Sequence, residues 1–170
     1  SNFISPKGIK VKKITSADEM LSEVKKSLPV DLAVCVAAVT DFRPVVKSKN
    51  KIKKENMNLN SINFVKNNDI LEYICKHNKY RPRLVAGFSA ETENLTENSI
   101  NKMKRKHCDI IFANNVSQKN IGFNSDYNKV SVIDKKGNVK IIPKNKKSFI
   151  ANKIAEILLD KLLIDDRNIN

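Results

Sequence analysis

The chain has few of the residues that mark several common protein classes. Among its 170 residues it has no tryptophan, four glycines and three cysteines, and aromatic residues make up 6%. The scarcity of aromatic rings disfavours a protein that stacks nucleic-acid bases. No run of about 18 apolar residues is present to cross a membrane, and the first residues lack an apolar stretch of the signal-peptide type. We therefore expect a cytoplasmic protein without a membrane partner.

The cysteines and histidines lack the spacings of a metal site or a disulfide framework. Cys35, Cys75 and Cys108 are scattered, and His77 and His107 have no partner at ligand spacing. An odd number of isolated cysteines is typical of reduced thiols in a reducing compartment. Buried thiols and helix-end or surface histidines are the favoured interpretation, with a catalytic thiol or metal ligand as the alternative.

The net charge of +14 does not by itself indicate a nucleic-acid partner. Only five of the 32 basic residues are arginine, and the chain is rich in Asn and Ile, a bias that A+T-rich coding sequence also produces. A solvated lysine surface is the favoured interpretation. A nucleic-acid-binding α/β module remains a hypothesis that rests on charge alone.

Apolar periodicity predicts alternating strands and helices. Strands are expected over residues 9–15, 32–39, 59–65, 84–90 and 109–113, with a hairpin over 129–133 and 139–142. Helices are expected over 17–27, after Asn67 or Asn68, over 93–107 and over 146–163. This order predicts an α/β fold: a three-layer, Rossmann-like, mostly parallel sheet with a C-terminal β-hairpin and helix. We expect one domain over 1–164 and a polar tail over 165–170.

Local patterns refine this prediction. Ser16 and Glu19 have the spacing of a capping box at the start of a helix. The apolar run 32–39 is typical of a central parallel strand covered on both faces. Asn67 or Asn68 is expected to cap the next helix. The apolar face of that helix is formed by Ile70, Leu71, Ile74 and Cys75.

The end of the 32–39 strand carries the most informative pattern. Small residues and a lone carboxylate, Asp41, are followed by the lysine cluster 51–54. In open α/β sheets, ligands bind beyond the carboxyl ends of the strands. A carboxylate beside several lysines suits a metal-bound polyphosphate, since lysines meet its oxygens and the carboxylate meets the cation. The pattern indicates a nucleotide-using enzyme.

Other polar clusters follow strand ends, at 66–71, 88–92 and 114–115. Lys102 and Lys106, four apart on a helix, repel each other slightly but would clamp a polyphosphate. Each cluster alone also has an ordinary structural explanation, such as a turn. The glycine-rich phosphate turn common in nucleotide-binding α/β domains is missing.

In this order, the blocks resemble phosphopantothenate–cysteine ligase, the synthetase half of the bifunctional bacterial coenzyme A biosynthesis protein. The matching blocks are 37–44, 51–54, 65–71, 81–82, 85–92, 109–116 and 122–128. The resemblance covers roughly residues 5–163. It implies a ligase that uses CTP to convert 4′-phosphopantothenate into an acyl-cytidylate. The amine of L-cysteine then displaces CMP.

The resemblance also implies roles for individual residues. Lys51 is implied as the catalytic residue that helps to form the acyl-cytidylate, and Asp41 as the residue that serves the nucleotide through Mg²⁺. Ala37 and Ala38 are implied to lie against the substrate, where only small side chains fit. The implied nucleotide-binding set is Asp41, Lys51, Asn68, Asp69, Ile70, Leu71, Phe88, Lys102 and Lys106.

Two departures from the family accompany this match. Asn68 stands where the family usually has proline, and the family's N-terminal glycine-rich block is absent from the chain. We therefore expect part of the triphosphate site to be missing, and a non-catalytic remnant is the alternative function. The choice between CTP and ATP stays open from the residues alone.

The resemblance implies partners as well. The family forms homodimers, here with contacts expected near 123–126 and in the loop after Lys54. A flavin-dependent decarboxylase domain is implied as a fused or associated partner.

Overall fold

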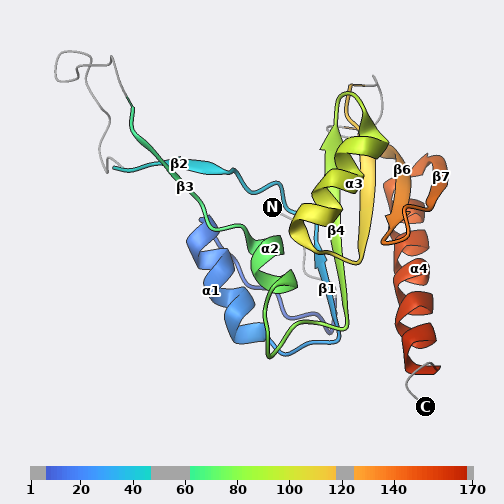
Figure 1. Ribbon diagram of the computed structural model, residues 1–170, viewed down its shortest axis with the longest axis horizontal. Coiled ribbons are helices and arrows are strands. Elements are labelled where there is room, and N and C mark those ends of the chain that lie inside the picture. The colour runs from blue at the N-terminus through green and yellow to red at the C-terminus, as the bar shows by residue number, and fades with distance from the viewer. Residues whose placement is uncertain (1–6, 47–61, 118–124, 168–170) are drawn as a thin grey trace. The chain divides into compact units, whose positions relative to one another are not determined.

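The computed structural model describes residues 7–46, 62–117 and 125–167 (Figure 1). The chain forms two compact units: a first unit of Ser1–Ser27 and Ala38–Ile70, and a second unit of Leu28–Ala37 and Leu71–Asn170. The helices are α1 (Ala17–Ser27), α2 (Ile70–Cys75), α3 (Leu95–Lys106) and α4 (Lys147–Arg167). The strands are β1 (Leu32–Cys35), β2 (Phe42–Pro44), β3 (Phe64–Lys66), β4 (Leu84–Glu91), β5 (Ile110–Asn115), β6 (Tyr127–Asp134) and β7 (Val139–Lys146).

The second unit is built on a five-stranded sheet in the order β1-β4-β5-β6-β7. The first three strands are parallel, and the hairpin β6–β7 continues the sheet in antiparallel fashion. Figure 1 draws this hairpin in orange with the red helix α4 alongside. The α/β class, the parallel core and the C-terminal hairpin and helix are thus confirmed. The hairpin forms part of the main sheet because β6 pairs directly with β5.

Helices cover both faces of this sheet. On one face, Ala86 and Phe112 pack in a buried cluster with Ile150 and Leu158 of α4. On the other face, Gly87 lies beside Leu71 of α2. Helix α3 connects β4 to the adjacent parallel strand β5, and right-handed crossovers place α2 and α3 on the same face. The second unit therefore has the predicted three layers.

Strand β1 differs from its prediction. The apolar run 32–39 predicted a central strand, but β1 ends at Cys35 and, within the described residues, pairs with β4 alone. Val34 is 40% exposed and Val36 is 60% exposed. An apolar run favours burial, but burial on both faces requires neighbours that no local pattern can supply. The prediction of a central position was wrong.

The strand predicted over 9–15 does not form. Ile9 and Val11 are 59% and 58% exposed. Alternation predicts which face of a strand is apolar, but a strand forms only where a neighbour pairs with its backbone groups. None of the described strands pairs with this segment.

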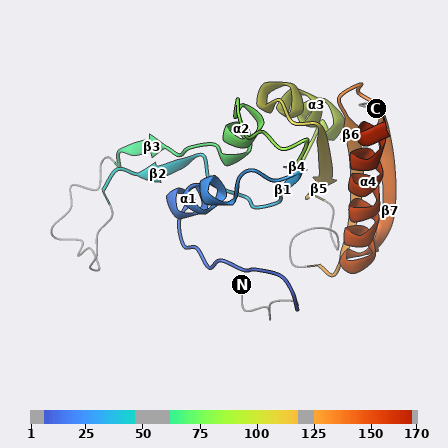
Figure 2. The same ribbon diagram turned by 90° about the horizontal axis from the view of Figure 1, so that it is seen from below.

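The first unit contains α1 and the antiparallel pair β2–β3. Helix α1 has the predicted bounds, and the Glu19 amide donates to Ser16 Oγ at 3.2 Å. The first half of the capping box thus forms as predicted, and the Glu19 carboxylate also accepts from the Thr15 amide at 2.7 Å. Strands β2 and β3 run side by side (Figure 2), with Pro44 opposite Phe64. Strand β2 was missed because three residues within a polar segment carry no periodic signal.

Gly87 of β4 lies where α2 packs most closely on the sheet. A Cβ atom at this position would lie 2.9 Å from Leu71 Cδ2 and 3.8 Å from Cys108 Sγ. A methyl group therefore fits only if Leu71 moves. The block that contains Gly87 thus has a packing requirement of its own, in addition to any role at the site.

We expect Gly87→Ala to lower the free energy of unfolding by about 1–3 kcal/mol, the usual cost of overpacking. Urea denaturation measures this value. In a double-mutant cycle, Leu71→Ala should cost less in the Gly87→Ala background than in the wild type, because the smaller side chain makes room for the new methyl group. Equal costs in both backgrounds would show that Leu71 is not the source of the strain.

Candidate nucleotide-binding site

In the second unit, four of the predicted nucleotide-binding residues gather around β4. Lys102 Nζ donates to the Phe88 carbonyl oxygen at 2.7 Å, and Leu71 packs against the neighbouring Gly87. Lys106 follows Lys102 by one turn of α3. The helix thus carries both ammonium groups toward β4 and α2. The expectation that the two lysines act as a pair on a polyphosphate stays a prediction.

A carboxylate that the sequence analysis missed joins this group. Glu72 Oε1 accepts from Lys76 Nζ at 2.6 Å, and Glu72 Oε2 accepts from Lys106 Nζ at 3.1 Å. These hydrogen bonds, from Lys76 first and Lys106 second, lower the pKa of Glu72 to about 2. Glu72 and Lys76 are four residues apart and form an ordinary i, i+4 surface pair. Nothing in the sequence connects Glu72 to a lysine 34 residues away.

In the first unit, Asn67 links the ends of β2 and β3. Its Nδ2 donates to the Thr40 carbonyl oxygen at 2.8 Å, and its Oδ1 accepts from Arg43 Nη1 at 2.7 Å. The Asn67 amide donates to the Asp41 carbonyl oxygen at 2.8 Å. Asp41 therefore lies beside Asn67, because the antiparallel strands β2 and β3 pair Phe42 with Lys66. The expected helix cap by Asn67 was wrong, because this buried side chain is used between the strands.

The remaining predicted residues are divided between the two units. Ala37 belongs to the second unit and Ala38 to the first, and both are exposed. In the first unit, Asn68 is exposed and Asp69 half-buried, while Ile70 is buried. The catalytic prediction, Lys51, lies outside the described residues.

Asp41 of the first unit has an exposed carboxylate. Among the described residues, no three His, Cys, Asp or Glu side chains gather to hold a metal ion. Mg²⁺ in nucleotide sites is commonly bound by one or two carboxylates together with the substrate phosphates and waters. The donor set therefore fits a cation that arrives with a nucleotide, held in part by Asp41, better than a fully protein-bound metal.

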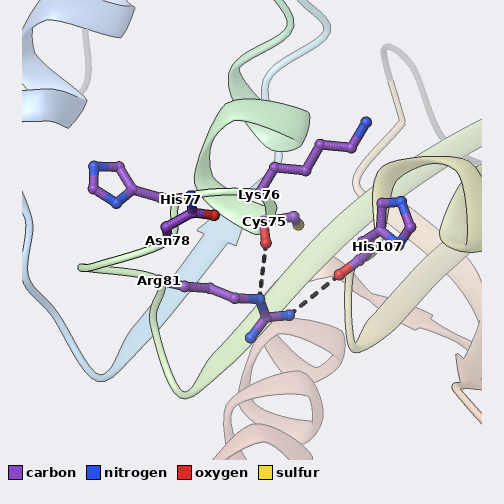
Figure 3. A pocket seen from close by; sticks show the side chains of 6 residues that line it. All are labelled: Cys75, Lys76, His77, Asn78, Arg81 and His107. Atoms are coloured by element: carbon purple, nitrogen blue, oxygen red, sulfur yellow. Dashed lines mark hydrogen bonds between the residues drawn. The ribbon is translucent and has the colours of Figure 1, made fainter.

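A surface hollow lies at the amino ends of β4 and β5 (Figure 3). Arg81 spans it: Nε donates to the Cys75 carbonyl oxygen at 2.9 Å, and Nη2 donates to the His107 carbonyl oxygen at 3.2 Å. The same Nη2 is 3.0 Å from both carboxylate oxygens of Asp109. Ligands of open α/β sheets bind at the opposite, carboxyl ends. The hollow is therefore a structural junction. Its lining consists of Cys75, Lys76, His77, Asn78, Arg81 and His107.

The cysteines and histidines near this junction have structural roles. Cys75 and Cys108 are buried free thiols, and the pKa of Cys75 is raised by its hydrogen bond with Cys108 and by burial. His77 Nδ1 accepts from the Tyr80 amide at 3.1 Å. His107 ends α3 in the left-handed region, with φ of 59°. The predictions of buried thiols at these two positions and of a helix-end histidine are confirmed. Cys35 is half-buried.

The fold and the site together define an open α/β domain in which Lys102 and Lys106 of α3 are directed toward β4 and α2. Residues 1–162 match the family described as DNA/pantothenate metabolism flavoprotein C-terminal domain. The chain belongs to this family, and the resemblance expected from its sequence blocks is confirmed.

Curated relatives and a solved structure agree. The chain is 38% identical over 160 residues to "Coenzyme A biosynthesis bifunctional protein CoaBC" of Borreliella burgdorferi, covering 93% of this chain and 40% of that protein. It is 34% identical over 169 residues to the protein of the same name in Escherichia coli, covering 96% of this chain and 40% of that protein. It thus spans about two fifths of these relatives.

A crystal structure of the C-terminal domain of CoaBC superposes with a TM-score of 0.75 at 25% identity. That match covers 96% of this chain and 71% of the other. Within the described ranges, no helix is long and apolar enough to cross a membrane.

Proposed function

We propose that this chain is the domain that joins 4′-phosphopantothenate to L-cysteine in coenzyme A biosynthesis, with CTP as co-substrate. The observation that carries the proposal is the placement of the lysines of α3, where Lys102 meets the Phe88 carbonyl of β4 and Lys106 meets Glu72 of α2. The chain that carries them matches CoaBC over 93% of its length. Two lysines one helical turn apart suit a triphosphate, because each can neutralise part of its charge.

The reaction proceeds in two steps. A carboxylate oxygen of 4′-phosphopantothenate attacks the α-phosphorus of CTP, and the bond to the β-phosphate breaks to release pyrophosphate. The amine of cysteine then attacks the acyl carbon, loses a proton, and displaces CMP to leave an amide. Both steps bring anions together or expel them, so cationic side chains lower both barriers.

Each residue of the proposed site answers one requirement of this chemistry. Lys51 stabilises charge on the α-phosphate as the acyl-cytidylate forms. Lys102 and Lys106 bind the nucleotide phosphates, and Asp41 holds part of the Mg²⁺ shell, a cation that neutralises phosphate charge when bound. Ala37 and Ala38 leave room for substrate. Base and ribose are framed by Asn68, Asp69, Ile70, Leu71 and Phe88.

A thermal-shift titration of the chain with CTP, ATP and GTP, with and without Mg²⁺, tests the proposal. A ligand at 100 times its dissociation constant adds about 2.7 kcal/mol of stability. We expect a shift with CTP that Mg²⁺ enlarges, and a smaller shift with ATP or GTP. A shift with ATP alone would transfer the proposal to an ATP-dependent ligase. Absence of a shift with any nucleotide would favour a non-catalytic remnant.

We further propose that the chain forms a homodimer through the β2–β3 pair. Phe64 is 60% exposed and lies opposite Pro44, so Phe42 and Phe64 share one face of the pair. Exposed apolar patches of this kind mark interaction sites, and the expected dimer contact after Lys54 follows β2 in the chain. The exposed apolar residues near the pair are Phe42, Val45, Val46, Ile62 and Phe64.

Phe64→Asp should convert the dimer to a monomer, because it places a charge in the apolar contact. Sedimentation velocity measures the change in mass. Phe149→Asp is the matched control, since Phe149 is an exposed phenylalanine on α4, 42% accessible. A wild-type monomer, or a dimer that withstands Phe64→Asp, would contradict this proposal.

The bifunctional naming of the relatives supports a second domain, a flavin-dependent decarboxylase, as the natural partner of this one. Since the chain spans about 40% of those relatives, the proposal assigns it the first of two consecutive reactions. The decarboxylase would then act on the ligase product.

A further inference from the structure

The Glu72 carboxylate is paired with Lys106, one of the two lysines assigned to the nucleotide phosphates. The carboxylate accepts from Lys106 at 3.1 Å and from Lys76 at 2.6 Å. A bound triphosphate would bring several negative charges to the same ammonium group. The carboxylate and the phosphates would then repel each other across Lys106.

We propose that Glu72 is an internal competitor of the nucleotide: it occupies Lys106 in the unliganded protein, and the triphosphate displaces it. This inference rests on the proposed function, because it takes Lys106 as a phosphate ligand. Lys76 makes the exchange possible. It lies one turn further along the chain and keeps the displaced carboxylate paired.

A positioning role is the opposite possibility, since a carboxylate can also hold a lysine in place for its ligand. Two observations decide against it. The Lys106 side chain is only 13% exposed, so packing restricts its stem. The Glu72 side chain is 34% exposed, so it can move toward solvent when a ligand arrives. The competitor role therefore predicts that repulsion of the phosphates by Glu72 outweighs any gain from holding the ammonium group.

Isothermal titration calorimetry of the full chain tests the proposal, with Mg²⁺–CTP and inorganic tripolyphosphate as ligands. Glu72→Gln is expected to tighten binding by about five- to tenfold, where tenfold is 1.4 kcal/mol. The same variant loses two ion pairs and should melt at a lower temperature. A less stable variant that binds more tightly separates competition from structural damage.

Two further variants sharpen the test. Glu156→Gln removes the same charge from an exposed pair with Lys153 on α4 and should leave affinity unchanged. In a Lys106→Met background, the gain from Glu72→Gln should fall below about twofold, because the contested ammonium group is gone.

The outcomes separate this inference from the proposed function. If the wild type does not bind CTP but Glu72→Gln tightens tripolyphosphate binding, the competitor role is supported and the CTP assignment is wrong. If wild type binds CTP and Glu72→Gln binds equally or more weakly, the competitor role is overturned and the proposed function stands. No gain for either ligand also overturns the competitor role.

Discussion

Replacing Arg81 by methionine is expected to lower the free energy of unfolding by about 3–5 kcal/mol, the cost of removing one partner of a buried ion pair. Asp109 is 8% exposed, and Arg81 Nη2 contacts both of its carboxylate oxygens at 3.0 Å. Methionine keeps much of the apolar stem but none of the donors. The Asp109 carboxylate would keep Lys135 and the Val85 amide as partners. The carbonyl oxygens of Cys75 and His107 would lose the hydrogen bonds that the guanidinium donates to them.

Urea denaturation of Arg81→Met measures this loss, and Arg83→Met is the matched control. Arg83 is two residues away, and its contacts are longer, at 3.3 Å to the Leu162 carbonyl and 4.0 Å to Asp31. Its replacement should cost less than about 1 kcal/mol. Adding Asp109→Asn to Arg81→Met should cost less than the sum of the two single variants, since both substitutions remove the same Arg81–Asp109 ion pair. Similar losses for both arginines would refute the assigned role of the junction.

Replacing Lys51 by alanine is expected to slow the formation of the acyl-cytidylate by about 10²–10³-fold. This is the typical loss when one group that stabilises developing charge is removed. Because the proposed role concerns the α-phosphate during reaction, the rate should fall more than nucleotide affinity. Pyrophosphate release from CTP and 4′-phosphopantothenate measures the rate, and calorimetry measures the affinity.

Lys153→Ala is the matched control for Lys51→Ala, because Lys153 pairs with Glu156 on the surface of α4. It should leave pyrophosphate release unchanged. Equal rates for Lys51→Ala and wild type would remove Lys51 from the mechanism. An equal loss in rate and affinity would instead assign Lys51 to ground-state nucleotide binding.

The order of helices and strands could be predicted from local patterns. The bounds of α1 match the prediction because Ser16, Glu19 and the apolar periodicity all act within a few residues of the helix start. Strands β4 and β5 were recognisable as buried apolar runs, and both are covered on two faces in the second unit.

Predictions that depended on a neighbour distant in the sequence were less successful. The segment 9–15 alternates as a strand should, but lacks a described partner strand. Asn67 has a side chain that can cap a helix, but in the structure this side chain is hydrogen-bonded to Thr40 and Arg43 instead. In each case the local preference was real, and a tertiary contact decided whether it was satisfied.

The sequence by itself determined the α/β class, the family and the residue types available for phosphate chemistry, because these follow from short blocks and from periodicity. Only the tertiary structure decided that β1 lies at the sheet edge among the described strands, that Arg81 is a structural clamp and that Glu72 reaches Lys106. The physical reason is distance along the chain. The Arg81 and Glu72 contacts join residues 26 and 34 positions apart, and local sequence patterns carry no information about such pairs.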